Sequence, residues 1–218
     1  METATALTVT PIAAALALFL DTETTGLPLW KEPSEHPDQP HMVQLAAKLV
    51  NLNTREVVRS MDVLIKPDGW TIPEDTIAVH GITNERAAAE GIPEVDAVHQ
   101  LLAMAEELDV DGEVIGHNIS FDKRIVRIAI KRHIDAQLPE GADSHADAWK
   151  DRKDFCTMWK SKPHTRLPGN KHPKLTEAYQ HFMGKPMEGA HSAGGDVDGC
   201  IAVYFGIRDA EAPVLKAA

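Results

Sequence analysis

The stretch that decides the fold is FLDTETTGL, Phe19–Leu27, which closes an apolar run with two carboxylates placed one residue apart. The run itself, Ala14–Leu20, has the composition of a buried strand. Because side chains alternate along a strand, Asp21 and Glu23 are expected on the same side, just past its last apolar residue. Such a pair is stable with a raised pKa, a cationic partner or a metal ion. A hard divalent cation is the simplest of these solutions, and a solvated acidic turn is the alternative.

The composition is that of a single globular domain. A chain of 218 residues is long enough for one domain with a full core, and its net charge of −11 argues against a protein that coats nucleic acid by bulk electrostatics. Its two cysteines, Cys156 and Cys200, predict neither a disulfide framework nor a zinc site, and they fit a reducing cytoplasm. The apolar run Leu7–Leu20 lacks a preceding basic residue and a cleavage site, so we expect neither a secretory signal nor contact with a membrane.

The patterns along the rest of the chain indicate an α/β domain. Proline and polar residues make Pro28–His41 a surface loop. The alternating stretch Met42–Asn51 and the apolar stretch Val57–Lys66 predict a three-stranded meander with the first run. Helices are predicted in two short pieces within Pro73–Gly91, with Thr83 as an N-cap, then after Pro93, after a strand at Val114–Gly116, at Lys174–Phe182 and from about Ala193. We expect a flexible tail over residues 1–12, one domain over 13–211 and a C-terminal tail over 212–218.

Two further acidic residues lie at predicted helix starts. In HNISFD, residues 117–122, Ser120 is a candidate N-cap and Asp122 falls in the first turn, where the helix dipole alone would favour a carboxylate. His191 and Asp196 stand five residues apart, a spacing that separates them on one continuous helix. They converge only if His191 lies in the preceding loop and Asp196 in the first turn, which the neighbouring glycines permit.

One segment of this acidic chain is locally basic. Lys150–Lys174 holds eight Lys or Arg and two acidic residues. Such a run is either a solvated loop or a phosphate track for nucleic acid, with Trp159 as a stacking surface.

Together, FLDTETTGL, HNISFD and HSAGGD (residues 191–196) resemble the three motifs of the DnaQ-like, DEDDh 3′→5′ exonucleases, a family that includes proofreading subunits of bacterial replicative polymerases. The likeness runs from Phe19 to about Tyr204 and includes VQLA at Val43 and VHGIT at Val79. The long loop Pro28–His41 departs from the family. The resemblance implies a ribonuclease H-like α/β fold, with a mixed central sheet of about five strands flanked by helices. It also implies a metal-dependent 3′→5′ exonuclease that releases nucleoside 5′-monophosphates.

By position, the resemblance implies a site for two divalent cations, Mg²⁺ or Mn²⁺. Asp21 would bridge both ions, Glu23 and Asp196 would complete the first site, and Asp122 would hold the second ion, partly through water. His191 would be the general base. Physical chemistry supports these roles: two cations about 4 Å apart stabilise the attacking and leaving oxygens at phosphorus, oxygen ligands suit Mg²⁺ or Mn²⁺, and a neutral His can take a proton. The pocket for the terminal nucleotide is expected to be lined by Thr24, Leu27, His80 and Asn118.

The expected partner is the 3′ end of a nucleic acid, single-stranded DNA in preference to RNA, and a replication or repair protein is a second expected partner. An exoribonuclease of the same family is the nearest alternative. A haloacid-dehalogenase-like phosphatase would use Asp21 as a nucleophile, but it requires a second Asp where Glu23 stands and gives His191 no role. A non-catalytic nucleic-acid-binding module would be expected to lack an acidic ligand, and all four are in the sequence.

Overall fold

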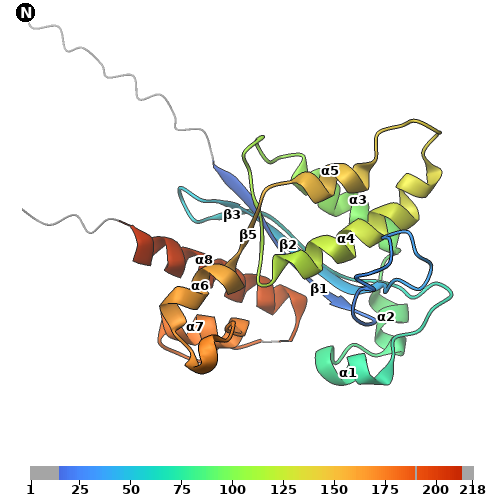
Figure 1. Ribbon diagram of the computed structural model, residues 1–218. Helices are drawn as coiled ribbons and strands as arrows, with labels where there is room; N and C mark the ends of the chain where they lie inside the picture. Colours follow the sequence, from blue (N-terminus) through green and yellow to red (C-terminus); the bar gives the residue numbers. More distant parts are fainter. Residues whose placement is uncertain (1–14, 190, 213–218) are drawn as a thin grey trace, which may run out of the picture.

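The fold is a five-stranded sheet covered by helices on both faces (Figure 1). The computed structural model describes residues 15–189 and 191–212, so the expected N-terminal tail and nearly all of the expected C-terminal tail lie outside the described residues. The strands are β1 (Leu16–Thr24), β2 (Met42–Asn51), β3 (Val57–Leu64), β4 (Val114–Gly116) and β5 (Asp154–Cys156). They lie in the order β3-β2-β1-β4-β5. None of the helices in the described ranges is long and apolar enough to cross a membrane.

The pairing of the strands follows from their connections. A long loop without a helix joins β1 to β2 and a short turn joins β2 to β3, and all three strands run antiparallel to their neighbours, as the predicted meander requires. Helices separate the later strands, and β4 therefore runs parallel to β1 and β5 parallel to β4. The mixed sheet and the ribonuclease H-like fold class are confirmed.

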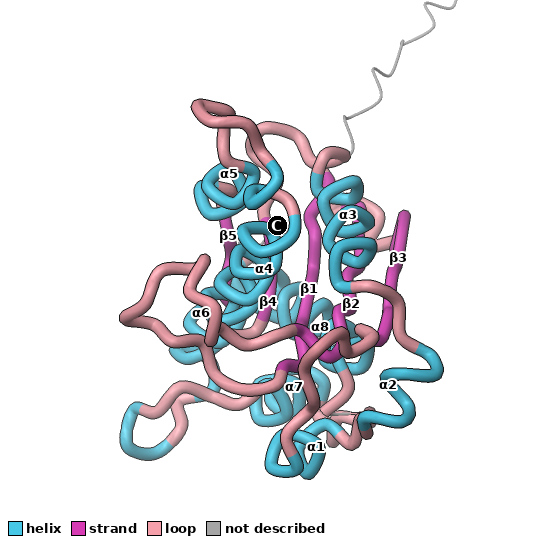
Figure 2. The backbone as a smooth tube through the Cα atoms, turned by 90° about the vertical axis from the view of Figure 1, so that its right-hand side faces the viewer, coloured by secondary structure: helices cyan, strands magenta, loops and turns pink. Residues whose placement is uncertain are grey.

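Two helical layers cover the sheet. The helices are α1 (Glu74–His80), α2 (Asn84–Glu90), α3 (Glu94–Ala105), α4 (Ile119–His133), α5 (His145–Asp151), α6 (Thr157–Thr165), α7 (Leu175–Met183) and α8 (Ala193–Glu211). Helices α3, α4 and α5 lie on one side of the sheet, and α6, α7 and α8 lie on the other (Figure 1). Figure 2 shows α3 and α4 beside each other in front of the strands. The alternation in β1 supplies both cores, with Leu18 and Leu20 facing one layer and Ala17 and Phe19 the other.

Three local expectations need correction. Strand β1 continues to Thr24, because residues 21–24 keep pairing with β2, so Asp21 and Glu23 lie within the strand and not beyond it. Helix α4 begins after Asn118, which adopts a left-handed conformation with φ 72°, and the expected N-cap Ser120 lies inside the first turn. The basic tract is not one loop, since it contains β5 and α6. The predicted cap of α2 is confirmed, because the side chain of Thr83 accepts a hydrogen bond from the N–H of Arg86.

Candidate active site

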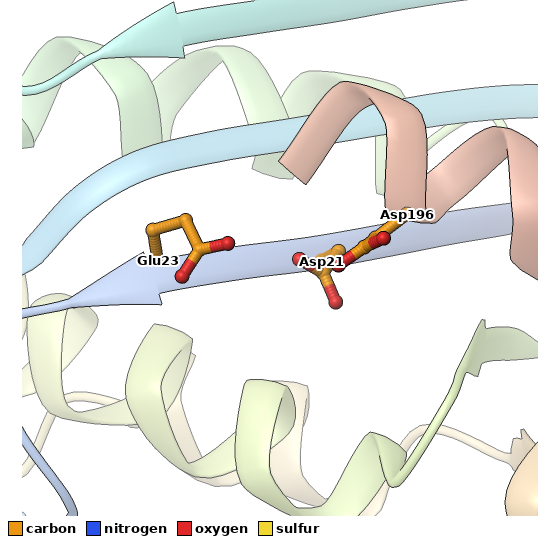
Figure 3. A group of neighbouring side chains, drawn as sticks. All are labelled: Asp21, Glu23 and Asp196. Carbon is orange, nitrogen blue, oxygen red and sulfur yellow. The ribbon is translucent and has the colours of Figure 1, made fainter. Parts of the chain in front are cut away.

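Three carboxylates meet where β1 passes the start of α8. Figure 3 shows Asp21 and Glu23 on the strand and Asp196 in the first helical turn. One oxygen from each lies within 4.8 Å of the other two, and all three residues are partly buried. Helix α8 is fixed here by Ser192, its N-cap, whose hydroxyl accepts a hydrogen bond from the N–H of Gly195 at 3.3 Å. We call these three side chains the carboxylate cluster.

Charge repulsion and burial shift the acidity of this cluster. Burial raises the pKa of Asp21 well above its ordinary value, and the carboxylates of Asp122, Asp196 and Glu23 raise it further. Burial and the charge of Asp196 raise the pKa of Glu23 to about 7. Since every donor is a carboxylate oxygen, the set suits a hard cation such as Mg²⁺ or Mn²⁺, whose charge would relieve the repulsion.

Asp122 approaches from the other side of the sheet, on the first turn of α4. Asp122 is 2% exposed as a residue, and its Oδ1 accepts hydrogen bonds from the N–H and the hydroxyl of Thr22 at 3.0 and 2.9 Å. Burial raises the pKa of Asp122 to about 7; the hydrogen bonds from Thr22 oppose that rise, and the charge of Glu23 adds to it. Asp122 is not a member of the 4.8 Å group found among the described residues, but its charge acts on Asp21. It therefore lies beside the carboxylate cluster, on the opposite flank from α8.

The loop before α8 brings His191 next to Asp196. His191 has a left-handed backbone, with φ 68°, and lies outside the helix, the arrangement that the five-residue spacing requires. Burial raises the pKa of Asp196, and the backbone N–H and the ring of His191 oppose that rise. The His191 side chain is exposed. The turn is tight: a Cβ atom on Gly195 would lie 2.1 Å from the carbonyl oxygen of Gly189.

The four residues expected around the terminal nucleotide differ in their surroundings. Thr24 is buried and its hydroxyl donates to the carbonyl of Gly26 at 2.8 Å. Leu27 is 77% exposed. The ring of His80 is buried; Nδ1 accepts from the N–H of Ile82 at 3.1 Å, and Nε2 has no hydrogen-bond partner among the described residues. The amide oxygen of Asn118 accepts from the hydroxyl of Ser120 at 3.3 Å. Their role in nucleotide binding stays a prediction.

Sequence reasoning missed two residues that hold the site together. Thr22 holds Asp122, although the alternation of β1 places it on the face opposite Asp21. Gln44 on β2 accepts a hydrogen bond from the N–H of Ala193 at 3.2 Å and so docks the start of α8 onto the sheet. Thr22 lies within the quoted stretch, but only the packing of α4 identifies its partner.

The family of the chain follows from its sequence match. A model of the exonuclease family, named RNase_T, matches residues 18–204. The chain belongs to the exonuclease family. The prediction of a DnaQ-like exonuclease is therefore confirmed, and the haloacid-dehalogenase-like alternative is wrong, because neither the family match nor the sheet agrees with it.

Solved structures of E. coli exonuclease I have the same fold as this chain. E. coli exonuclease I in complex with a 5cy-dT13 oligonucleotide is 20% identical with a TM-score of 0.67, over 90% of this chain and 41% of that one. A zinc-bound form of E. coli exonuclease I with single-stranded DNA is 21% identical with a TM-score of 0.66, over 90% and 41%. The chain thus spans about two fifths of the length of exonuclease I. No curated protein matches the sequence.

Proposed function

We propose that this exonuclease hydrolyses the phosphodiester bond at the 3′ end of single-stranded DNA and releases nucleoside 5′-monophosphates. The observation that carries the proposal is the carboxylate cluster, whose oxygens lie within 4.8 Å of one another beside the buried Asp122. A hydrolase that cuts phosphodiesters needs positive charge at both the attacking and the leaving oxygen, and such a cluster is suited to hold it.

The residues present fit two divalent cations, Mg²⁺ or Mn²⁺. Asp21 would contact both, Glu23 and Asp196 would complete one site, and Asp122 would hold the second. When bound, the ions supply charge stabilisation to the two oxygens exchanged at phosphorus. The chain's own contribution is to bring the three carboxylates of the cluster together and to hold Asp122 beside them through Thr22.

His191 is proposed as the general base that takes the proton of the attacking water. Its backbone is held beside Asp196 while its ring stays exposed, which leaves the imidazole free to turn toward the substrate. Histidine is the side chain that most often serves as a general base in enzymes. The unpaired Nε2 of His80 and the exposed Leu27 are proposed to contact the terminal nucleotide.

Single-stranded DNA is favoured as the substrate because solved structures of exonuclease I with the same fold hold dT13 and dA16 oligonucleotides. RNA is the alternative, since members of the family degrade either polymer. A replication or repair partner and a cytoplasmic location remain proposals, the latter supported by two cysteines that form no disulfide with each other.

The test is a digestion of matched oligonucleotides with resolution of the 3′ end. Single-stranded DNA, duplex DNA and RNA of one sequence are incubated with Mg²⁺, Mn²⁺ or a chelator. We expect stepwise shortening from the 3′ end, mononucleotide 5′-phosphates as products, and no reaction with chelator. Cleavage of a circular single strand at a comparable rate would instead show an endonuclease and overturn the proposal.

A further inference from the structure

We propose that a second surface, on α6 and the turn that follows it, binds the single strand upstream of the 3′ end. This inference rests on the proposed function. The surface surrounds a hollow of about 450 Å³, and no residue of the carboxylate cluster lines this hollow. We call it the Trp159 surface, and it is lined by Trp159, Lys162, Pro163, Arg166, Leu167 and Asn170.

The aromatic side chain of this surface is both exposed and held in place. Trp159 is 57% exposed, and its ring contacts that of His172 at a centroid distance of 4.0 Å and an angle of 63°. An indole fixed by a neighbour yet open to solvent provides a platform for a nucleobase. In a duplex, the faces of the bases are already stacked on one another. The platform therefore selects single-stranded nucleic acid.

The cations of the surface are free to meet phosphates. Lys162 and Arg166 have no carboxylate within ion-pair distance in the part of the chain that the structure describes, and no acidic residue lines the hollow. Arg166 adopts a left-handed backbone, with φ 47°, and its Nε donates to the carbonyl of Pro163 at 3.4 Å. In a chain of net charge −11, two unpaired cations beside an exposed indole form a local site for a polyanion.

A second basic cleft lies beside the loop that carries Trp30 and can be compared with the Trp159 surface as a site for phosphates. Two of its four cations are in ion pairs: Lys123 with Asp154 at 2.7 Å, and Arg127 with Asp147 at 2.7 Å. The carboxylate of Asp154 itself lines this cleft and repels a phosphate, whereas no acidic residue lines the hollow of the Trp159 surface. The charge pattern thus favours the Trp159 surface.

The Trp159 surface also begins close to the cluster. Thr157, the first residue of α6, is fully buried; its hydroxyl lies 3.2 Å from the carbonyl oxygen of Gly116 and 3.5 Å from the sulfur of Cys200. Cys200 follows Asp196 by one helical turn on α8, about 6 Å along the axis, so this contact lies near the carboxylates. From Thr157 to Arg166 the helix advances about 14 Å at 1.5 Å per residue. A strand whose 3′ end lies at the cluster can therefore extend along α6.

The experiment compares a long and a minimal substrate. Turnover of the single-stranded oligonucleotide dT20 is measured beside that of the p-nitrophenyl ester of thymidine 5′-monophosphate, which offers a single nucleotide. Trp159→Ala should raise the KM for dT20 about 5- to 150-fold more than the KM for the ester, the range of base–aromatic stacking. Trp159→Phe should restore most of the affinity, because it keeps a ring. The matched charge control is Lys66→Glu, a cation without an ion pair in the described residues, which should leave both KM values unchanged.

Binding of dT20 is measured separately, by anisotropy, in an Asp21→Asn background that does not consume the ligand. The double variant Lys162→Glu with Arg166→Glu should lower the slope of log affinity against log salt by about 1.4, or about 0.7 per phosphate contact. An unchanged KM ratio in Trp159→Ala, or an unchanged salt slope in the double variant, would overturn the proposal. If the wild type hydrolyses neither substrate while these binding effects are present, the proposed function fails and the Trp159 surface stands.

Discussion

Thr22 and Asp122 connect the two flanks of the active site. The backbone N–H and the hydroxyl of Thr22 both donate to Oδ1 of Asp122, at 3.0 and 2.9 Å. Thr22 belongs to the strand that carries Asp21 and Glu23, but it points toward α4. A carboxylate from the opposite helical layer is thereby held next to the cluster.

Thr22→Val should weaken the hold on Asp122 without changing the volume of the side chain. The variant removes one of two hydrogen bonds to a buried carboxylate, a loss of about 1.5–3 kcal/mol, and raises the pKa of Asp122 further. We expect a higher Mg²⁺ requirement and a kcat about tenfold lower, measured by titrating the ion at saturating oligonucleotide. Thr22→Ser keeps the hydroxyl and is expected to behave as the wild type. An unchanged Mg²⁺ titration in Thr22→Val would show that the contact has only a structural role.

Asp21→Asn and Asp196→Asn should abolish turnover while the protein stays folded. Each removes a negative charge from a set of repelling carboxylates, so the metal-free variants should melt at or above the wild-type Tm. The loss of charge stabilisation amounts to several kcal/mol, which lowers the rate about 10³-fold or more. The measurements are oligonucleotide turnover and a thermal melt in chelator. Substantial turnover with saturating Mg²⁺ or Mn²⁺ would contradict the assignment of these residues as ligands.

His191→Ala should separate proton transfer from metal binding. The side chain is exposed and forms no ion pair within 4.0 Å with a carboxylate of the described residues. Its removal should therefore leave the affinity for Mn²⁺ nearly unchanged. Loss of a general base lowers the rate about 10²- to 10⁴-fold. Isothermal titration with Mn²⁺ and single-turnover kinetics test the two parts. A large loss of Mn²⁺ affinity would identify His191 as a ligand instead.

Much of this architecture could be predicted from periodicity. The buried strand, the meander that follows it and the two short helices on either side of Gly81 have strong local signals, and the structure contains them all. The placement of His191 in a loop and of Asp196 in the first turn of the helix could also be predicted, because residues five apart on one continuous helix do not converge.

The segment from Lys150 to Lys174 could not be predicted in the same way. Strand β5 has three residues, too few for an alternation, and α6 is polar and contains Pro163. The contact between Thr22 and Asp122 could not be predicted for a different reason. The contact joins residues one hundred positions apart and depends on how α4 crosses the sheet, which no local pattern encodes.

The stabilisation of the protein by metal ions should grow as the pH rises. The folded pKa values of Glu23 and Asp122, each about 7, lie above their ordinary values of 4.5 and 3.8. The metal-free folded chain therefore holds more protons than the unfolded chain between about pH 4 and 7, and its stability falls as the pH rises through this window. A bound ion keeps both groups ionised, so the increase in Tm on adding Mg²⁺ should be larger at pH 8 than at pH 5.

Melting curves with Mg²⁺ and with chelator, recorded at each pH, test this. Burial lowers the pKa of His80 and His117, and this makes stability rise with pH near 6.5. The effect is common to both conditions and cancels in the difference. Glu23→Gln should flatten the pH dependence of that difference. A metal-induced shift in Tm that is constant from pH 5 to pH 8 would contradict the coupling.

Glu94 is expected to stabilise the end of the long loop Pro28–His41. It is 5% exposed in the first turn of α3; its Oε1 accepts from the N–H of Met42 at 2.9 Å, and its Oε2 contacts His133, His41 and Arg132 at 2.8, 3.0 and 3.2 Å. Burial opposes ionisation, but the hydrogen bonds from His133 and His41 and the charge of Arg132 hold the pKa of Glu94 well below its usual range.

Glu94→Ala should cost about 3–5 kcal/mol, because it leaves the guanidinium of Arg132 with no carboxylate in a partly buried position. At this chain length that loss lowers the Tm by roughly 6–20 °C. The same guanidinium donates to the carbonyls of Gln39 and Pro40, so the end of the loop should become more susceptible to proteolysis. The matched control is Glu107→Ala, which removes a carboxylate from the exposed pair with Arg59 and should cost less than about 1 kcal/mol. Equal losses of Tm in the two variants would show that burial does not set the strength of the Glu94 contacts.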